Sequence, residues 1–132
     1  MDCLFCKIVA GEIPCMKVDE SEHFLAFLDI APVQQGHTLV IPKEHSESFD
    51  DFSTEHATEF LEFTQKVSKH VVKQVGAAGC NVGINNGEAA GQIIFHTHFH
   101  VIPRRERDGL ESWHGTACSQ GELKKVHEKL RQ

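Results

Sequence analysis

The chain has 132 residues, of which 40% are hydrophobic and 24% charged, proportions that favour a folded domain over a disordered chain. Thirteen basic and nineteen acidic residues give a formal charge of −6, and no cluster of basic residues occurs, so general binding to nucleic acid or to an anionic membrane is disfavoured. Residues 1–14 lack the apolar run of a signal peptide and no long apolar span follows, which predicts a cytoplasmic protein.

The first half of the chain predicts one short helix followed by two strands. Residues 3–10 place four apolar side chains on one helical face and are followed by Gly11, a residue typical of helix ends. Residues 23–29 and 37–42 are runs of apolar and β-favouring residues, and proline closes the second run. We expect these two strands to pair through a short antiparallel connection.

The second half predicts a long helix and then a hairpin. From Ser53, a residue suited to capping a helix, apolar residues recur every three or four positions as far as Gly76. Residues 80–84 and 92–102 then have the composition of two strands. They flank the glycine-bearing loop 85–91, an arrangement typical of a β-hairpin.

The last predicted element is a short helix after Ser119. Ser119 and Glu122 have the spacing of a capping box, and the apolar residues that follow them share one side of the helix. No internal repeat or low-complexity linker divides the chain. We therefore expect residues 1–132 to form a single domain.

Three histidines at alternate positions mark the segment IIFHTHFHVIP, residues 93–103. On a strand, His96, His98 and His100 would point to one face with successive Cα atoms about 7 Å apart. Two chemical interpretations are open: neighbouring imidazoles bind one catalytic metal, or one imidazole attacks phosphorus while the others support it electrostatically. A polar, solvated strand face is the alternative without a function.

The segment HTHFHVIP, together with NNGEAAGQ and FLDIAPVQQGHTLVIPKEH, resembles the histidine triad (HIT) family of nucleotide hydrolases and transferases. The resemblance covers about residues 3–104 and leaves 105–132 as a C-terminal tail. It implies an α+β fold in which an antiparallel sheet of about five strands packs with one long helix and short terminal helices, paired as a homodimer. Asn85 is typical of the Hint-like branch, which favours purine nucleoside monophosphoramidates. Dinucleoside polyphosphate hydrolysis and a nucleotide-binding regulator with little turnover remain alternatives.

The resemblance also implies roles for individual side chains. His98 would attack the α-phosphorus and form a nucleotidyl-histidine intermediate that water then hydrolyses. His100 and the distant His37 would contact the phosphate or assist proton transfer, and Asp29 would accept from the ribose hydroxyls. The base pocket implied by the family consists of Leu4, Phe5, Ile8, Phe27 and Ile30; core packing is the other role open to these residues.

The loop between the last two predicted strands independently suits an anion. Gly87 and Gly91 let backbone N–H groups approach a phosphate, and the side chains of Asn85 and Gln92 can donate further hydrogen bonds. A plain hairpin turn is the alternative. Ile93 departs from the family pattern, because many close relatives have a hydroxyl residue there that assists the leaving group.

Cys3 and Cys6 have a spacing that suits half of a tetrahedral zinc site or a redox pair. No predicted strand precedes residue 3, which disfavours a thioredoxin-like motif. The family resemblance implies that His45 and His96 complete a structural Cys₂His₂ zinc site, so that no catalytic metal is expected. The other cysteines are expected to be free thiols: Cys15, Cys80 and Cys118.

Overall fold

The computed structural model of residues 2–131 contains a five-stranded antiparallel sheet in the order β1-β2-β3-β5-β4. The helices are α1 (Leu4–Val9), α2 (Ala57–Val75) and α3 (Gln120–Leu130), with 3₁₀ turns η1 (Phe49–Asp51), η2 (Thr54–His56) and η3 (Glu88–Ala90). The strands are β1 (Lys17–Glu20), β2 (Phe24–Leu28), β3 (Thr38–Pro42), β4 (Gly79–Gly83) and β5 (Phe99–Arg104). This arrangement confirms the predicted α+β class and the hairpin formed by β4 and β5.

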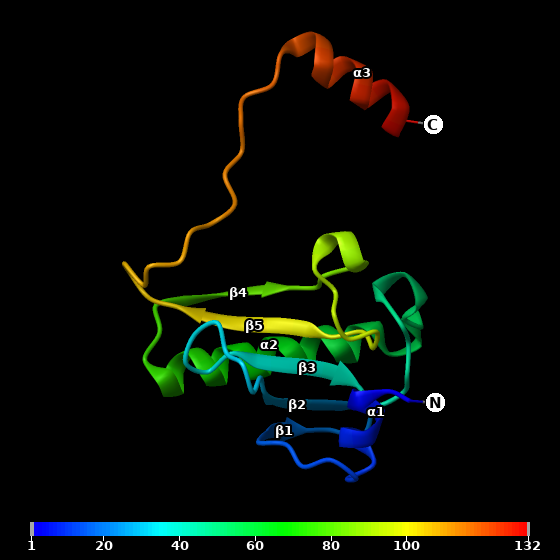
Figure 1. The fold of residues 1–132 in the computed structure, drawn as a ribbon, viewed down its shortest axis with the longest axis vertical. Helices are drawn as coiled ribbons and strands as arrows, with labels where there is room; N and C mark the ends of the chain where they lie inside the picture. The colour runs from blue at the N-terminus through cyan, green and yellow to red at the C-terminus, as the bar shows by residue number, and fades with distance from the viewer. Residues whose placement is uncertain (1, 132) are drawn as a thin grey trace.

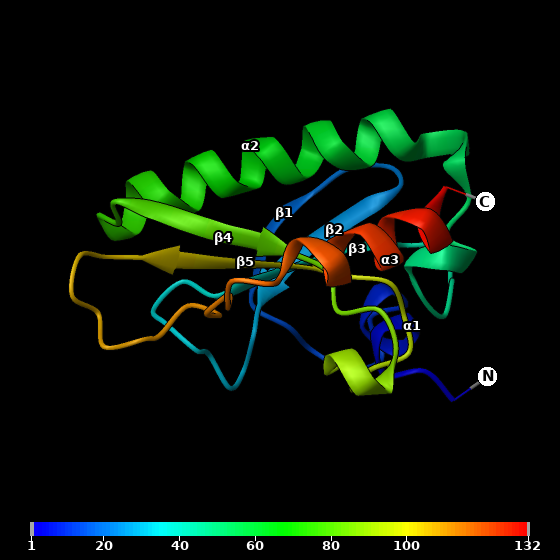
Figure 2. The same cartoon turned by 90° about the horizontal axis from the view of Figure 1, so that it is seen from above.

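Both faces of the sheet centre are covered, because successive side chains of a strand point to opposite sides. On β2, Phe24 and Ala26 pack against α2, and the Phe24 ring stacks on Phe60 with centroids 4.7 Å apart. The intervening Leu25 and Phe27 join a second apolar cluster with α1. Figure 2 shows α2 along one face of the sheet and α1 on the other side. The α1 side carries the candidate site.

The long helix starts later than predicted but ends where expected. Ser53 caps the turn η2, since its hydroxyl accepts from the Glu55 N–H, and α2 begins only after His56. At the other end Gly76 adopts a left-handed conformation with φ 67°, and its N–H bonds back to the last carbonyls of the helix. Glycine adopts this conformation without the steric cost that a side chain would add.

The edge strand β1 was not predicted. Its sequence, KVDE, has one apolar residue and lacks the apolar run that marks a buried strand. The two middle residues are half-buried and the two outer ones exposed. The strand exists because β2 offers it an unpaired edge, and the pairing is irregular between Lys17 and Asp19. Tertiary pairing, rather than local propensity, decides this element.

The predicted strand 92–102 is wrong at its start, because β5 begins at Phe99. The preceding residues turn aside: the Thr97 N–H donates to the Ser46 carbonyl at 2.8 Å instead of to a neighbouring strand. Only His100 of the three alternating histidines therefore lies on the sheet. His96 and His98 lie on an irregular segment beside it, so the expected single strand face of three imidazoles does not form.

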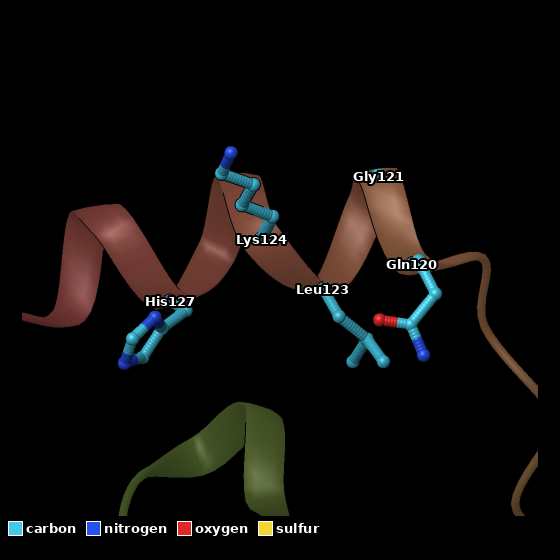
Figure 3. Close-up of a pocket in the computed structure, with 5 residues that line it drawn as sticks. All are labelled: Gln120, Gly121, Leu123, Lys124 and His127. Carbon is cyan, nitrogen blue, oxygen red and sulfur yellow. The ribbon is translucent and has the colours of Figure 1, made fainter.

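The C-terminal helix stands apart from the sheet. Figure 1 shows residues 111–119 as an extended segment that leads α3 away on the β4 side. Every residue of α3 is exposed, and Ser119 caps it by accepting from the Glu122 N–H at 3.2 Å, as the sequence predicted. A hollow of about 450 Å³ is lined by Gln120, Gly121, Leu123, Lys124 and His127, and Figure 3 shows the side chains of Gln120, Leu123 and His127 on the side of the helix away from Lys124. Within residues 2–131, no helix is long and apolar enough to cross a membrane.

Candidate functional site

The segment that carries His96 and His98 is held by hydroxyl and carbonyl groups of the loop after β3. Thr97, which is 1% exposed, donates from Oγ1 to the Ser48 carbonyl at 2.8 Å. Its Oγ1 also lies 2.7 Å from the Ser46 hydroxyl. Both neighbouring imidazoles meet the Phe5 ring edge-on, with centroids 5.8 Å from His96 and 5.2 Å from His98, so they share the α1 side of the segment. The sequence contained no signal for the anchor at Thr97.

Hydrogen-bond partners fix the tautomer of His98. Its Nδ1 lies 2.6 Å from the His96 carbonyl oxygen, which can only accept, so Nδ1 carries the proton. The proton on Nδ1 leaves the Nε2 lone pair free. The ring is 6% exposed and packs edge-on against Phe5 with centroids 5.2 Å apart. A buried, oriented imidazole with a free Nε2 is a competent nucleophile.

A second chain of hydrogen bonds joins His37 to His100. The Val33 N–H donates to His37 Nδ1 at 3.1 Å, so the proton of this ring is on Nε2. His37 Nε2 lies 2.9 Å from His100 Nδ1 and donates to it. The remaining nitrogen of His100, Nε2, is therefore the protonated one, and this ring lies 4.9 Å from His98 between centroids. His100 can donate a hydrogen bond to an anion held beside His98.

Asp29 lies next to the hydrogen-bonded pair of His37 and His100, and its predicted role as acceptor for the ribose hydroxyls stays a prediction. One of its oxygens accepts from the Ala31 N–H at 2.9 Å, and the other lies 3.7 Å from His37 Nε2. The carboxylate is half-buried at the end of β2. It is the acidic group of a cluster that contains His37 and His100.

Burial keeps the site imidazoles neutral. Desolvation lowers the pKa of His98, although the bond to the His96 carbonyl and the charge of Asp29 oppose this. Desolvation, followed by the charges of His98 and His37, lowers the pKa of His100 to about 4. The pKa of His37 is lowered as well, mainly by burial. At neutral pH the rings therefore act through lone pairs and N–H groups rather than through full charge.

The predicted base-pocket residues divide into buried and exposed members. Phe5 and Phe27 are each 4% exposed and meet edge-to-face with centroids 5.5 Å apart, so both belong to the core on the α1 side. Ile8 is half-buried beside them. Leu4 is 42% exposed and Ile30 fully exposed, so these two offer open apolar surface for a base. The predicted base contacts stay predictions.

The loop 85–91 uses most of its donors internally. The Gly87 N–H donates to the Gln92 side-chain oxygen at 2.9 Å, and the Gly91 N–H donates to the Glu88 carbonyl. Gln92, 4% exposed, donates from its amide to the Glu47 carbonyl at 2.7 Å. The Asn85 amide lies 3.5 Å from the Gly91 carbonyl. Direct phosphate contacts from these groups stay predictions, and Gln92 has a structural role that the sequence did not reveal.

The expected Cys₂His₂ set converges beside the histidine site. His96 donates from Nε2 to the Pro42 carbonyl at 2.8 Å, which turns its Nδ1 lone pair towards the cysteines. This Nδ1 lies 3.4 Å from Cys3 Sγ, 3.6 Å from Cys6 Sγ and 3.2 Å from His45 Nδ1. Cys6 Sγ is in turn 3.4 Å from His45 Nδ1.

These separations fit one tetrahedral ion. Zinc bonds of about 2.3 Å to sulfur and about 2.05 Å to nitrogen place the nitrogen–nitrogen and sulfur–nitrogen pairs roughly 3.3–3.6 Å apart. Burial, and then the neighbouring Cys3 sulfur, raise the pKa of the Cys6 thiol to about 11. The Cys6 sulfur therefore needs a bound cation to become a thiolate at neutral pH. Four protein ligands would leave no open position for water, which suits a structural metal.

Comparison with known proteins identifies the family. A model of the HIT domain matches residues 10–107. The chain is 44% identical over 132 residues to adenosine 5'-monophosphoramidase hnt1 of Schizosaccharomyces pombe, covering 98% of this chain and 96% of that protein. A solved HIT family member from Bacillus subtilis has a TM-score of 0.89 at 41% identity, covering 99% and 96%. A Zn-bound histidine triad protein from Mycobacterium smegmatis has a TM-score of 0.79 at 35% identity, covering 98% of both chains.

Proposed function

The chain belongs to the HIT domain family, and on this premise we propose that it is a hydrolase of purine nucleoside 5'-monophosphoramidates. The observation that carries the proposal is the His98 ring, whose Nδ1–H is bound to a backbone carbonyl at 2.6 Å while Nε2 is free. The name of the S. pombe relative, adenosine 5'-monophosphoramidase, supports the substrate class.

The proposed reaction proceeds by two displacements at the α-phosphorus. His98 Nε2 attacks phosphorus, a phosphorus–imidazole bond forms, and the protonated amine leaves as a neutral amine with the electron pair of its bond. The imidazole ring then carries positive charge, which the His96 carbonyl stabilises through the Nδ1–H. In the second step water attacks phosphorus, the electron pair returns to Nε2, and the nucleoside monophosphate is released with the water proton lost to solvent.

The two hydrogen bonds that link Val33 to His37 and His37 to His100 orient the phosphate. His100 Nε2–H donates to a non-bridging oxygen, and the bond from His37 holds the ring in the tautomer that can donate. Asp29 binds the ribose hydroxyls as an acceptor, and the exposed Leu4 and Ile30 contact the base. Most of the rate enhancement then comes from positioning and charge stabilisation.

The covalent step can be tested directly. The wild-type protein is mixed with adenosine 5'-phosphoramidate, quenched within milliseconds and digested for mass spectrometry, and we expect an AMP adduct on the peptide that contains His98. His98→Ala removes the nucleophile and lowers kcat/KM by about 10⁴-fold or more, as removal of other catalytic nucleophiles does. His70→Ala, on the exposed side of α2, is the matched control. An adduct on another residue, or full activity of His98→Ala, contradicts the mechanism.

We also propose that Cys3, Cys6, His45 and His96 bind one structural zinc ion. The separations of their ligand atoms support this, and the Zn-bound M. smegmatis relative is compatible with it. The ion would join α1 to the segment that carries His98. Chelation is expected to lower the melting temperature and to release one zinc per chain, measured by calorimetry and a colorimetric zinc assay. If an unchanged melting temperature accompanied complete zinc release, the ion would have no structural role.

A homodimer is the assembly we propose. The edge strand β4 exposes Val82 to 47%, and the tail exposes Trp113 fully and Leu123 to 51%. A second copy that covers these apolar side chains would also satisfy the free edge of β4. Sedimentation should show a dimer in the wild type and a shift towards monomer in Val82→Glu. A wild type that sediments as a monomer at micromolar concentration contradicts the proposal.

A further inference from the structure

A second group of metal-ligand side chains lies where α2 begins beside the start of β2. His23 precedes β2, His56 caps α2, and Glu59 follows His56 by three residues on the same helical face. Their ligand atoms all lie within 4.8 Å of one another. The two imidazoles are stacked, with centroids 4.0 Å apart and an angle of 20° between the rings.

Core packing places the two histidines together before any ligand arrives. His23 is next to Phe24 in the chain, and His56 lies one helical turn before Phe60. The rings of Phe24 and Phe60 stack at 4.7 Å, so this buried contact sets the position of α2 along β2. The hydrophobic core therefore fixes the backbone positions of the two histidines, and only their side chains need to rotate out of the stack to bind one ion.

The surroundings of the pair favour a cation. Glu59 Oε2 lies 3.5 Å from His56 Nδ1, Glu55 approaches His56 Nε2 at 4.0 Å, and Glu22 approaches His23 Nε2 at 3.8 Å. Within residues 2–131, no side-chain hydrogen bond engages the ring of His23 or His56. Both rings are about one third exposed, at 38% and 35%, so their nitrogens can be reached from solvent.

We propose that His23, His56 and Glu59 form a second metal site, for a divalent ion of the Zn²⁺ type. Imidazole nitrogen and carboxylate oxygen are ligands that such an ion takes, and three protein ligands leave at least one position for water. Nitrogen and oxygen atoms bound to one tetrahedral ion lie about 3.4 Å apart, roughly 1.4 Å closer than the 4.8 Å within which these atoms lie. Rotation of the partly exposed side chains supplies this movement without a change in the backbone.

The second site differs chemically from the Cys₂His₂ cluster but shares a pocket with it. The lining of one cavity of about 80 Å³ includes His23 and His56 as well as His45 of the Cys₂His₂ cluster. The experiment must therefore separate the two sites by their ligands. The Cys₂His₂ cluster contains two sulfurs, whereas the second site offers only nitrogen and oxygen.

Metal stoichiometry and Co²⁺ spectroscopy test the proposal. In equilibrium dialysis against buffered Zn²⁺, the wild type is expected to bind one ion more per chain than His23→Gln or His56→Gln. Loss of one ligand should lower the affinity of the second site for Zn²⁺ by about tenfold or more. His70→Gln, an exposed histidine farther along α2, should bind as the wild type does. With Co²⁺, the equivalent lost in the two variants should lack a thiolate charge-transfer band.

The possible outcomes discriminate between the two metal proposals. Equal stoichiometry and affinity in the wild type, His23→Gln and His56→Gln overturns the second site, provided that circular dichroism shows the variants folded. An equal loss in His70→Gln also overturns it, because binding would then be a general property of surface histidines. If the wild type binds one ion without a thiolate band and His56→Gln binds none, the second site stands and the structural zinc proposal fails.

Discussion

Replacing Thr97 by valine removes a buried hydroxyl while keeping the volume and β-branching of the side chain. In the wild type this hydroxyl donates to the Ser48 carbonyl at 2.8 Å and accepts from the Ser46 hydroxyl at 2.7 Å. Each such bond contributes about 1 kcal/mol, and a buried acceptor left without a partner adds a further cost, so we expect unfolding free energy to fall by about 2–3 kcal/mol.

The larger consequence is catalytic. Thr97 anchors the segment between His96 and His98, and the 2.6 Å bond that orients the nucleophile connects these two residues. Loss of the anchor lets His98 Nε2 move relative to phosphorus, and displacements of this kind reduce kcat/KM by about ten- to hundredfold. Thr97→Ser keeps the hydroxyl and should retain most activity even if the lost methyl group lowers stability.

Urea unfolding and kcat/KM on adenosine 5'-phosphoramidate measure both effects. Thr64→Val is the matched control, since Thr64 is a buried threonine on α2 whose hydroxyl donates to the Phe60 carbonyl at 2.8 Å. This control should lose stability without losing rate. The reasoning is refuted if Thr97→Val unfolds within about 0.5 kcal/mol of the wild type, the range of ordinary surface substitutions, and hydrolyses substrate at the wild-type rate.

Three further predictions follow from burial and backbone geometry. Because burial lowers the pKa of His100 to about 4, only the unfolded chain binds a proton at this residue between pH 6.5 and 4. The free energy of unfolding should therefore fall as the pH decreases across that range. The pH profile of kcat/KM should show no inflection from His100 near the ordinary pKa of about 6.5. Such an inflection, which disappears in His100→Gln, would contradict this. Gly36→Ala, at φ 90°, adds a Cβ only 3.0 Å from Val75 Cγ1. It should lower the melting temperature more than Gly76→Ala, since Gly76 also has a positive φ, 67°, but open space around its Cβ position. Equal losses in the two variants would exclude a contribution from the contact with Val75. Gln92→Ala removes three hydrogen bonds to backbone groups and should cost about 2–3 kcal/mol in urea unfolding, and a loss below about 1 kcal/mol would show that water replaces the amide.

Local patterns in the sequence were sufficient to predict most of the helices and strands. The apolar period of α2, the glycine after it and the capping spacing at Ser119 each act within a few residues, so they can be read without knowledge of the fold. The start of α2 was misplaced because Ser53 caps a 3₁₀ turn that precedes the helix. The strand β1 was missed because an exposed edge strand needs no apolar run.

The segment with the three histidines shows that alternation of residues does not by itself predict where a strand begins. Alternation predicted one strand with three imidazoles on one face, whereas His96 and His98 lie before β5 and make different contacts. The roles predicted for the individual histidines came from the family resemblance. The structure shows which carbonyls set two of the tautomers: Pro42 accepts from His96, and His96 accepts from His98.

Patterns in the sequence by themselves predicted most helices and strands, whereas the family resemblance, rather than spacing, implied the Cys₂His₂ ligand set and the attack of His98 on phosphorus. Only the tertiary structure decided the tautomers, the anchor at Thr97 and the meeting of His23 with His56. The physical reason is distance along the chain. Helix and strand patterns arise from neighbouring residues, whereas Thr97 and Ser46, like His23 and His56, become neighbours only when the core has packed.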